Sequence, residues 1–521
     1  MSILRTLGAF VAAAAVGASV SVGWAQGVAP EPHVAPEPPV APEPHVGSGP
    51  PQDLPDLGSP ANAAISIEEE YQAGLAYVAY IRESGAILND PEISQYAQEI
   101  GHSLSSHAQE GEHQFYYMVL RDPVVNAAAI PGGFVLINSG LILMTRNENE
   151  LAGVLAHETA HVTQRHIVRG IIDQSHAGLL TTAAMLAGIL LGATAGRGNP
   201  NAVEGAVLAG QSAAIQHQIN YTRDNEYEAD RIGIGTMVSA GYDPLGMASF
   251  FDFMSQAGPN PERINAVQFL IDHPIFSDRV AEAKNRAAQV GRIHHEDSLG
   301  YLLTRERLRS VAADPEAALQ YYARLARNNG GKNIEDRYGK AVAQINAKMP
   351  AAAIPELQAL VREYPRVMQF YGALGQAYLA TNQMKESKAI LSSAMDLFPR
   401  NVPITIRYAE TLMRSGDNKQ AHLVLLDLFN VVEPTPDQTR LIAKAASAAG
   451  DTADSYAYMA EFYLMTGDLN TALSQLQLAL TMPGLDAIQR ARFSARLEEV
   501  RAAIPKKDRK NTVADDTRGD R

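Results

Sequence analysis

A spacing of 34 residues in the C-terminal third of the chain restricts its fold more than any other sequence feature. Units that begin at Ile334, Met368, Val402 and Ala453 each carry a small residue at their eighth position and another at their twentieth. Small side chains at these two positions let a pair of antiparallel helices approach closely. The pattern therefore predicts an all-α solenoid over residues 334–486 rather than a plain helical bundle. The small residues are Ala341, Gly375, Ala409 and Ala460 at the eighth position and Ala353, Ser387, Ala421 and Ala472 at the twentieth.

The second unit identifies the type of repeat. Its Tyr371, Leu374-Gly375, Tyr378, Ala394 and Pro399 fall at positions typical of a tetratricopeptide repeat. Asn382, Gly416 and Gly467 suit the turn between the two helices of their units, because these residue types tolerate a left-handed backbone. Around the repeats we expect a helical connection or degenerate repeat at 301–333, a C-terminal helix at 487–504 and a charged disordered tail at 505–521.

The N-terminal sequence indicates export. One positive charge at Arg5 precedes an uncharged apolar run to Val22, and Gly23-Trp24-Ala25 places small residues where a signal peptidase reads them. We expect a signal peptide at 1–25, cleaved near Ala25-Gln26; an uncleaved membrane anchor is the alternative. Three proline-rich hexads then predict an extended linker over 26–62.

Composition excludes several functions. The net charge of −14 argues against nucleic acid, whose binding needs a basic surface. The chain contains no cysteine, which excludes disulfides, thiolate metal sites and a lipoprotein attachment cysteine. An exported chain of this kind must be held together by packing alone.

A separate domain is expected over residues 63–300. Ser66 followed by Glu69, and Asp90 followed by Pro91, are helix-start signals. Residues 113–120 read as a strand, and Pro131-Gly132-Gly133 reads as a turn that leads into a second short strand at Phe134–Asn138. The domain is thus predicted to be mostly helical with a small sheet.

The segment "HETAH", His157–His161, suggests metal chemistry. Two histidines four residues apart leave the same face of a helix, so both rings can reach one tetrahedral Zn²⁺ ion. Glu158 can then take a proton from a metal-bound water that attacks a peptide carbonyl, and pass it to the leaving amine. The alternative is a solvated helix with paired His and Glu, but Leu151, Val154 and neighbouring apolar residues predict a buried one.

A third protein ligand must come from elsewhere in the chain. His166 and His176 are the nearest histidines, but the spacing of an extended HExxHxxGxxH motif is not met, since Gln164 and Ile167 stand at its last two positions. We interpret His166 as a bystander. Glu226 and Asp230, four residues apart on a second predicted helix, are the better candidates: Glu226 as ligand and Asp230 as the group that orients a ligating histidine. An exposed charged helix face is the alternative.

These residues together resemble the gluzincin metallopeptidases of the CAAX prenyl protease/HtpX family. His157-Glu158-x-x-His161, followed by Glu226-x-x-Ala-Asp230, is similar to that family's motif pair, and His273-Pro274 with Arg279 to a further motif. The resemblance implies a zinc endopeptidase that binds one Zn²⁺ through His157, His161 and Glu226, with Glu158 as general base. It gives His273 two possible roles, as an inhibitory zinc ligand or as a donor to the oxyanion, and it gives Arg279 the role of binding substrate backbone or bracing the site.

The fold class expected is therefore a zincin-type α+β metallopeptidase domain followed by a tetratricopeptide-repeat solenoid. Exported, repeat-bearing members of the family imply a periplasmic enzyme that acts on misfolded or stalled outer-membrane proteins, and whose repeats contact the outer-membrane assembly machinery. The alternative is a non-proteolytic chaperone or adaptor with a structural or latent zinc site. The uncharged segment 177–196 is a core helix, a flap over the site or a region of peripheral membrane contact.

Overall fold

The computed structural model describes residues 65–108, 114–174, 223–256, 269, 272–275 and 277–504. All of them belong to one compact unit, Leu57–Arg521. The expected signal peptide, the proline-rich linker, the 177–196 segment and the charged tail lie outside the described residues. In the part of the chain that is described, no helix has both the length and the apolar character needed to cross a membrane.

The two predicted helix starts of the first domain are confirmed. Helix α3 (Ile67–Glu83) begins with a capping box, in which Ser66 accepts the backbone N–H of Glu69 and the Glu69 side chain accepts the backbone N–H of Ser66. Helix α4 (Pro91–Ser105) begins at its N-cap Asp90, whose carboxylate accepts the N–H of Ile93.

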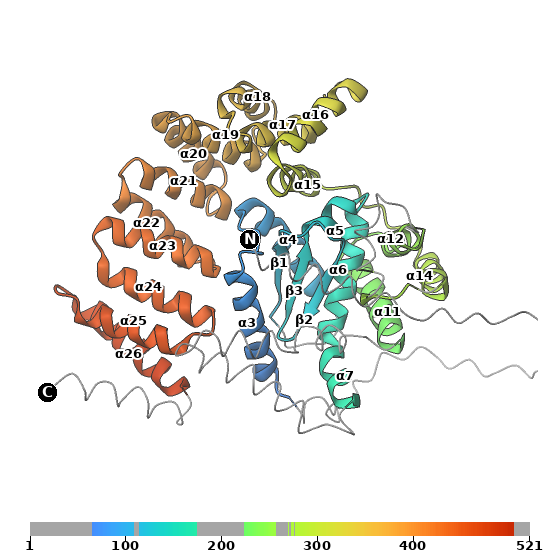
Figure 1. Ribbon diagram of the computed structural model, residues 1–521, viewed down its shortest axis with the longest axis horizontal. Helices are drawn as coiled ribbons and strands as arrows, with labels where there is room; N and C mark the ends of the chain where they lie inside the picture. Colours follow the sequence, from blue (N-terminus) through green and yellow to red (C-terminus); the bar gives the residue numbers. More distant parts are fainter. Residues whose placement is uncertain are drawn as a thin grey trace, which may run out of the picture. The chain divides into compact units, whose positions relative to one another are not determined.

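The sheet has three strands in the order β1-β3-β2 (Figure 1). Strand β1 (Tyr116–Leu120) runs parallel to β3 (Phe134–Asn138), and β2 (Ala127–Ile130) pairs antiparallel with β3, with Ala129 opposite Val135. The Pro131-Gly132-Gly133 turn joins β2 to β3, as predicted. A Cβ on Gly132, whose φ is +83°, would lie 2.5 Å from the Cα of Tyr71 in α3, so glycine is required at this close approach. Strand β2 was not predicted. It forms one edge of the three-stranded sheet.

Helix α6 (Glu148–Thr163) is the centre of this domain, and every one of its residues is buried. Asn147 caps it by accepting the N–H of Glu150. It packs against α4, against β2, and against two helices that follow later in the chain, α11 (Arg223–Ser239) and α12 (Leu245–Ser255). Among the described residues, the domain also contains the helices α5 (Ser139–Met144), α7 (His166–Gln174) and α14 (Ser277–Val290).

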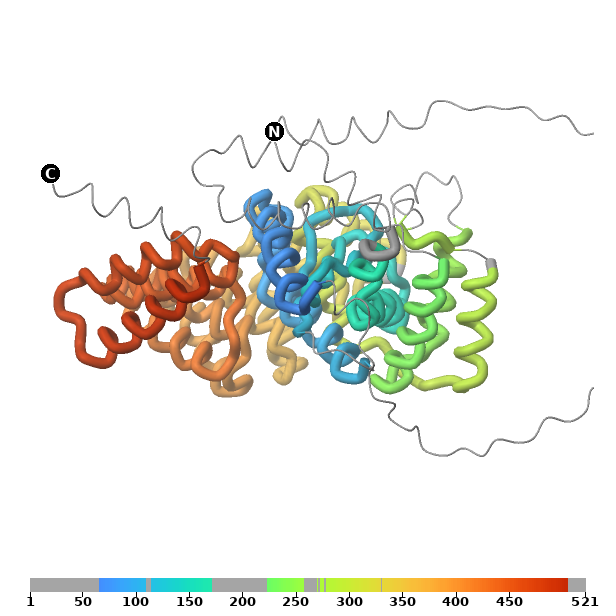
Figure 2. Tube along the Cα trace, turned by 90° about the horizontal axis from the view of Figure 1, so that it is seen from below, coloured from blue at the N-terminus to red at the C-terminus, as the bar shows by residue number. Residues whose placement is uncertain are grey.

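The repeat region consists of antiparallel helices stacked in chain order, shown from yellow to red in Figure 2. The predicted small residues at the eighth and twentieth positions are all buried where paired helices meet; at Gly375, a Cβ would lie 2.6 Å from Leu391 of the partner helix. The helices are α15 (Leu299–Ala312), α16 (Pro315–Asn329), α17 (Ile334–Asn346), α18 (Pro350–Glu363), α19 (Met368–Ala380), α20 (Met384–Leu397), α21 (Val402–Arg414), α22 (Asn418–Phe429), α23 (Pro436–Ala449), α24 (Thr452–Met465), α25 (Leu469–Thr481) and α26 (Ala487–Ala503).

The register of the repeats changes at α24. A residue with positive φ closes the turn inside each unit, at Lys348, Asn382, Gly416, Gly450 and Gly467. The first four are 34 residues apart (382 − 348, 416 − 382, 450 − 416), but the last follows after 17 (467 − 450). Helix α24 is therefore joined to both of its neighbours by the turn that normally lies within one repeat. The unit predicted to begin at Ala453 exists, but it is preceded by α23, which the sequence pattern did not predict.

Candidate metal centre

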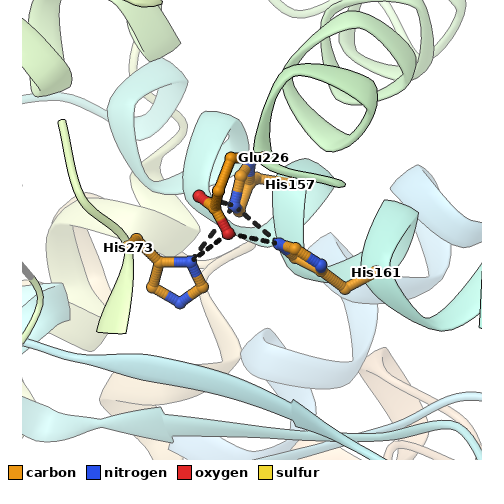
Figure 3. Close-up of side chains that lie close together, drawn as sticks. All are labelled: His157, His161, Glu226 and His273. Atoms are coloured by element: carbon orange, nitrogen blue, oxygen red, sulfur yellow. Dashed lines mark hydrogen bonds and ion pairs between the residues drawn. The ribbon is translucent and has the colours of Figure 1, made fainter. Parts of the chain in front are cut away.

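Four side chains from three separate segments meet beside α6 (Figure 3). His157 and His161 come from α6, Glu226 from α11 and His273 from the segment 272–275. One ligand atom from each lies within 4.8 Å of the others, and all four side chains are buried. The Nε2 atoms of His157 and His161 are 2.9 Å apart, Nε2 of His161 is 3.4 Å from Oε1 of Glu226, and Nδ1 of His273 is 3.4 Å from the same oxygen.

Close helix packing brings Glu226 to the histidines. Ala229 of α11, a helix that packs on α6, is completely buried. One turn further on, a Cβ on Gly233 would lie 3.1 Å from the backbone nitrogen of His157. Because neither residue carries a larger side chain, the backbone of α11 approaches α6 closely enough for Glu226 and Asp230 to reach His157.

The spacing of these atoms fits a zinc ion. Nitrogen and oxygen ligands about 2.1 Å from a tetrahedral Zn²⁺ lie about 3.4 Å from one another. The contacts of His157 with the other three side chains, and of Glu226 with His161 and His273, run from 2.9 Å to 3.5 Å, and all four ligand atoms lie within 4.8 Å of one another. Three imidazoles and a carboxylate are also the donors that zinc prefers. The nitrogen and carboxylate lone pairs of these four buried side chains repel one another, so a shared cation or proton is needed to stabilise the arrangement.

Asp230 and Arg279 surround the cluster from the α11 and α14 side. Oδ1 of Asp230 lies 2.9 Å from Nδ1 of His157. Arg279 donates from Nε and Nη2 to the two oxygens of Asp230 at 2.7 and 2.8 Å, and its Nη1 is 2.7 Å from Oε2 of Glu226 and donates to the carbonyl of Pro274. Burial lowers the pKa of His157, but Asp230 and Glu226 outweigh it and raise that pKa to about 10.

The second histidine is held differently. Nδ1 of His161 faces Nδ1 of His166 at 2.7 Å, and Nε2 of His166 lies 3.1 Å from Oε2 of Glu228. Burial lowers the pKa of His166 to about 4, which keeps its ring neutral. His166 is not among the four grouped ligand residues, in line with its exclusion as a ligand, but it contacts a ligand histidine directly. His166 stands three residues beyond Thr163, the last residue of α6, and the positive φ of Arg165 turns it back towards His161.

Glu158 lies between the cluster and the sheet. Its Oε2 accepts the backbone N–H of Ala129 in the edge strand β2 at 2.8 Å, and its Oε1 is 3.3 Å from Nε2 of His273 without a hydrogen-bond partner of its own. Burial raises the pKa of the Glu158 carboxyl, against the opposing effect of the facing histidines. A carboxylate with a raised pKa beside a metal cluster is poised to exchange a proton.

Comparison with known proteins identifies relatives over most of the chain. The sequence profile of peptidase family M48 matches residues 91–287. A protein of Vibrio cholerae serotype O1 is 32% identical over 458 residues, which cover 86% of this chain and 92% of the relative. The β-barrel assembly-enhancing protease of Escherichia coli K12 is 30% identical over 450 residues, 86% of this chain and 91% of the relative. The mitochondrial metalloendopeptidase OMA1 of Schizosaccharomyces pombe is 31% identical over 166 residues, 31% of this chain and 43% of the relative.

Proposed function

This chain belongs to peptidase family M48 and is a zinc metalloendopeptidase, and we propose that it acts in the periplasm on outer-membrane proteins that are misfolded or stalled during assembly. The relative named a β-barrel assembly-enhancing protease, which this chain matches over most of its length, supports a role in outer-membrane protein assembly. The predicted signal peptide at residues 1–25 supports export to the periplasm. In this proposal the repeat domain binds clients and the outer-membrane assembly machinery.

The observation that carries the catalytic assignment is the position of Glu158. Its carboxylate lies between the edge of β2 and the cluster of His157, His161, Glu226 and His273. His157, His161 and Glu226 would hold the zinc ion, which lowers the pKa of a bound water and polarises the peptide carbonyl. Glu158 would act as general base, taking a proton from the attacking water at its carboxylate and returning it to the leaving amine.

The remaining residues prepare this reaction. Asp230 faces Nδ1 of His157 and directs its Nε2 towards the cluster. Within the described residues, strand β2 pairs with β3 alone and forms an edge of the sheet beside Glu158, where an extended substrate segment can pair with the backbone. His273 lies among the ligand atoms, with Nδ1 3.3 Å from Nε2 of His157, and this position supports its role as a fourth zinc ligand that holds the enzyme inactive at rest.

Cleavage of casein, or of a stalled β-barrel protein, tests the assignment. Glu158→Gln should keep its zinc and lose cleavage, while Glu282→Gln on the exposed face of α14 should match the wild type. Equal cleavage by Glu158→Gln and wild type, with equal zinc content, would refute the proposed mechanism, and no cleavage by either protein would favour a chaperone or adaptor. His273→Ala should raise activity if His273 is an inhibitory ligand, whereas a loss would assign it to transition-state stabilisation.

A further inference from the structure

The junction between α6 and α7 folds one histidine back onto another. Helix α6 ends at Thr163 and α7 begins at His166, and Arg165 between them has a φ of +50°, which is uncommon for a residue other than glycine. The turn aims the His166 ring at His161, and the side chain of His166 is completely buried.

Arg165 is fixed in this conformation by α3. Its Nε donates to Oε1 of Glu70 at 2.6 Å, and its Nη2 donates to the carbonyl of Ile65. Both side chains of the Arg165–Glu70 pair are buried. A backbone conformation that is unfavourable for arginine is thus maintained by a buried ion pair, as is typical of positions with a functional constraint.

The contacts of His166 define the tautomers of both rings. If His161 donates from Nδ1, its Nε2 presents a lone pair to the cluster, and the proton of His166 lies on Nε2, where Glu228 accepts it. The opposite arrangement would place a proton of His161 inside the cluster and an unprotonated nitrogen of His166 against a carboxylate. Only the first arrangement suits all three groups.

We propose that His166 is a positioning residue for the zinc ligand His161, and that Glu228 fixes His166 in turn. The inference rests on the proposed zinc centre. His157 is oriented by a carboxylate, Asp230, but His161 is oriented by a neutral ring, whose own partner Glu228 pairs with Arg169 at 2.8 Å. The Glu228 side chain is 26% exposed, so the chain of contacts reaches from the zinc ligand to the surface.

Helix α11 therefore serves both ligand histidines. Glu226 and Asp230 face the cluster and His157, while Glu228 faces α7 and His166. These acidic residues of the sequence Arg223–Arg231 are thus explained by contacts with the histidines. An exposed helix face would not direct three carboxylates at four histidine rings and two arginines.

Zinc affinity of the full chain, measured by competition with a chromophoric chelator, tests the proposal without relying on activity. His166→Phe, which keeps the ring but removes both nitrogens, should weaken zinc binding about 10–100-fold. His166→Gln, which keeps an acceptor, should recover part of this loss, and Glu228→Gln should show a smaller loss. The control Glu282→Gln, which also removes a carboxylate paired with an arginine, should bind zinc as the wild type does.

Thermal unfolding separates positioning from packing. His166→Phe should lower the Tm of the zinc-loaded protein more than that of the protein held in excess chelator. An equal loss in both forms, with unchanged zinc affinity, would overturn the role of His166 and leave the zinc enzyme intact. A wild type that binds no zinc would overturn the proposed function and this inference together.

Discussion

Replacement of Arg279 by methionine tests whether this side chain braces the metal centre or binds substrate. Its guanidinium contacts both oxygens of Asp230 at 2.7 and 2.8 Å, Oε2 of Glu226 at 2.7 Å and the carbonyl of Pro274 at 2.8 Å. The Arg279 side chain has no exposed surface. Its donors thus face the site's own residues, and we expect it to brace the site.

The expected loss of stability follows from the charges left behind. Methionine fills most of the volume but leaves two buried carboxylates, on Asp230 and Glu226, without their cation. Removal of one partner of a buried ion pair costs about 3–5 kcal/mol, mainly because the other charge remains buried and uncompensated. Asp230 would also lose its orientation towards His157, which should weaken zinc binding about 10–100-fold.

Urea unfolding and chelator competition measure these two losses. Arg279→Lys should give intermediate values, because one ammonium cannot replace a planar group that spans two carboxylates. The double variant Arg279→Met/Asp230→Asn should recover part of the stability, since it removes one of the orphaned charges. If Arg279→Lys changed only KM, with wild-type stability and zinc affinity, the bracing role would be refuted and substrate binding supported.

Three further changes test other parts of the structure. Arg307→Met removes a 3%-exposed side chain that donates to both oxygens of Asp90 at 2.7 Å. Urea unfolding should show that the free energy of unfolding falls by about 3–5 kcal/mol. A fall of less than about 1 kcal/mol, the value expected for the control Arg286→Met at an exposed ion pair, would contradict this prediction. Burial raises the pKa of Asp90, but Arg307 outweighs it and lowers that pKa below its ordinary value, so this stabilisation is present above about pH 4 and is lost as the pH falls through the lowered value. Urea midpoints should therefore fall more between about pH 5 and about pH 3 in the wild type than in Asp90→Asn. Ala129→Pro removes the N–H that Glu158 accepts, so kcat for casein should fall with zinc content unchanged; an unchanged kcat would show that this hydrogen bond does not position Glu158.

Local patterns predicted the metal-binding helix, while its partners depended on packing. The four-residue spacing of His157 and His161 and the pair Glu226 and Asp230 both repeat at one helical turn, so each pair was visible in the sequence. The contact of Glu158 with Ala129 could not be inferred, because β2 is a short alanine strand whose sequence has no alternation of polar and apolar residues. The same limit applies to His166, whose position depends on the backbone of the preceding residue.

The repeat region shows a comparable division. Small residues at fixed positions predicted the helix pairs that begin at Ile334, Met368 and Val402 to the exact residue. The pattern did not predict α23, because the next matching unit begins 51 residues after Val402 (453 − 402), one and a half repeats along. Helix α24 packs against both α23 and α25 through the same kind of turn. The solenoid therefore continues, but the 34-residue spacing of the small residues is interrupted there.

The absence of cysteine gives the buried ion pairs a clear structural role. Packing alone was expected to hold this chain together, yet arginine–carboxylate pairs connect segments far apart in sequence: Glu70 with Arg165, Asp90 with Arg307, Glu92 with Arg407, and Asp230 with Arg279. Buried pairs of this kind add little net stability over apolar contacts, because desolvation offsets most of the attraction. Their value lies in geometry, since a planar guanidinium that bonds a carboxylate tolerates little displacement. The Asp230–Arg279 pair contacts the ligand cluster directly, and the Glu70–Arg165 pair holds the turn that brings His166 against His161, so two of the four pairs also position zinc ligands.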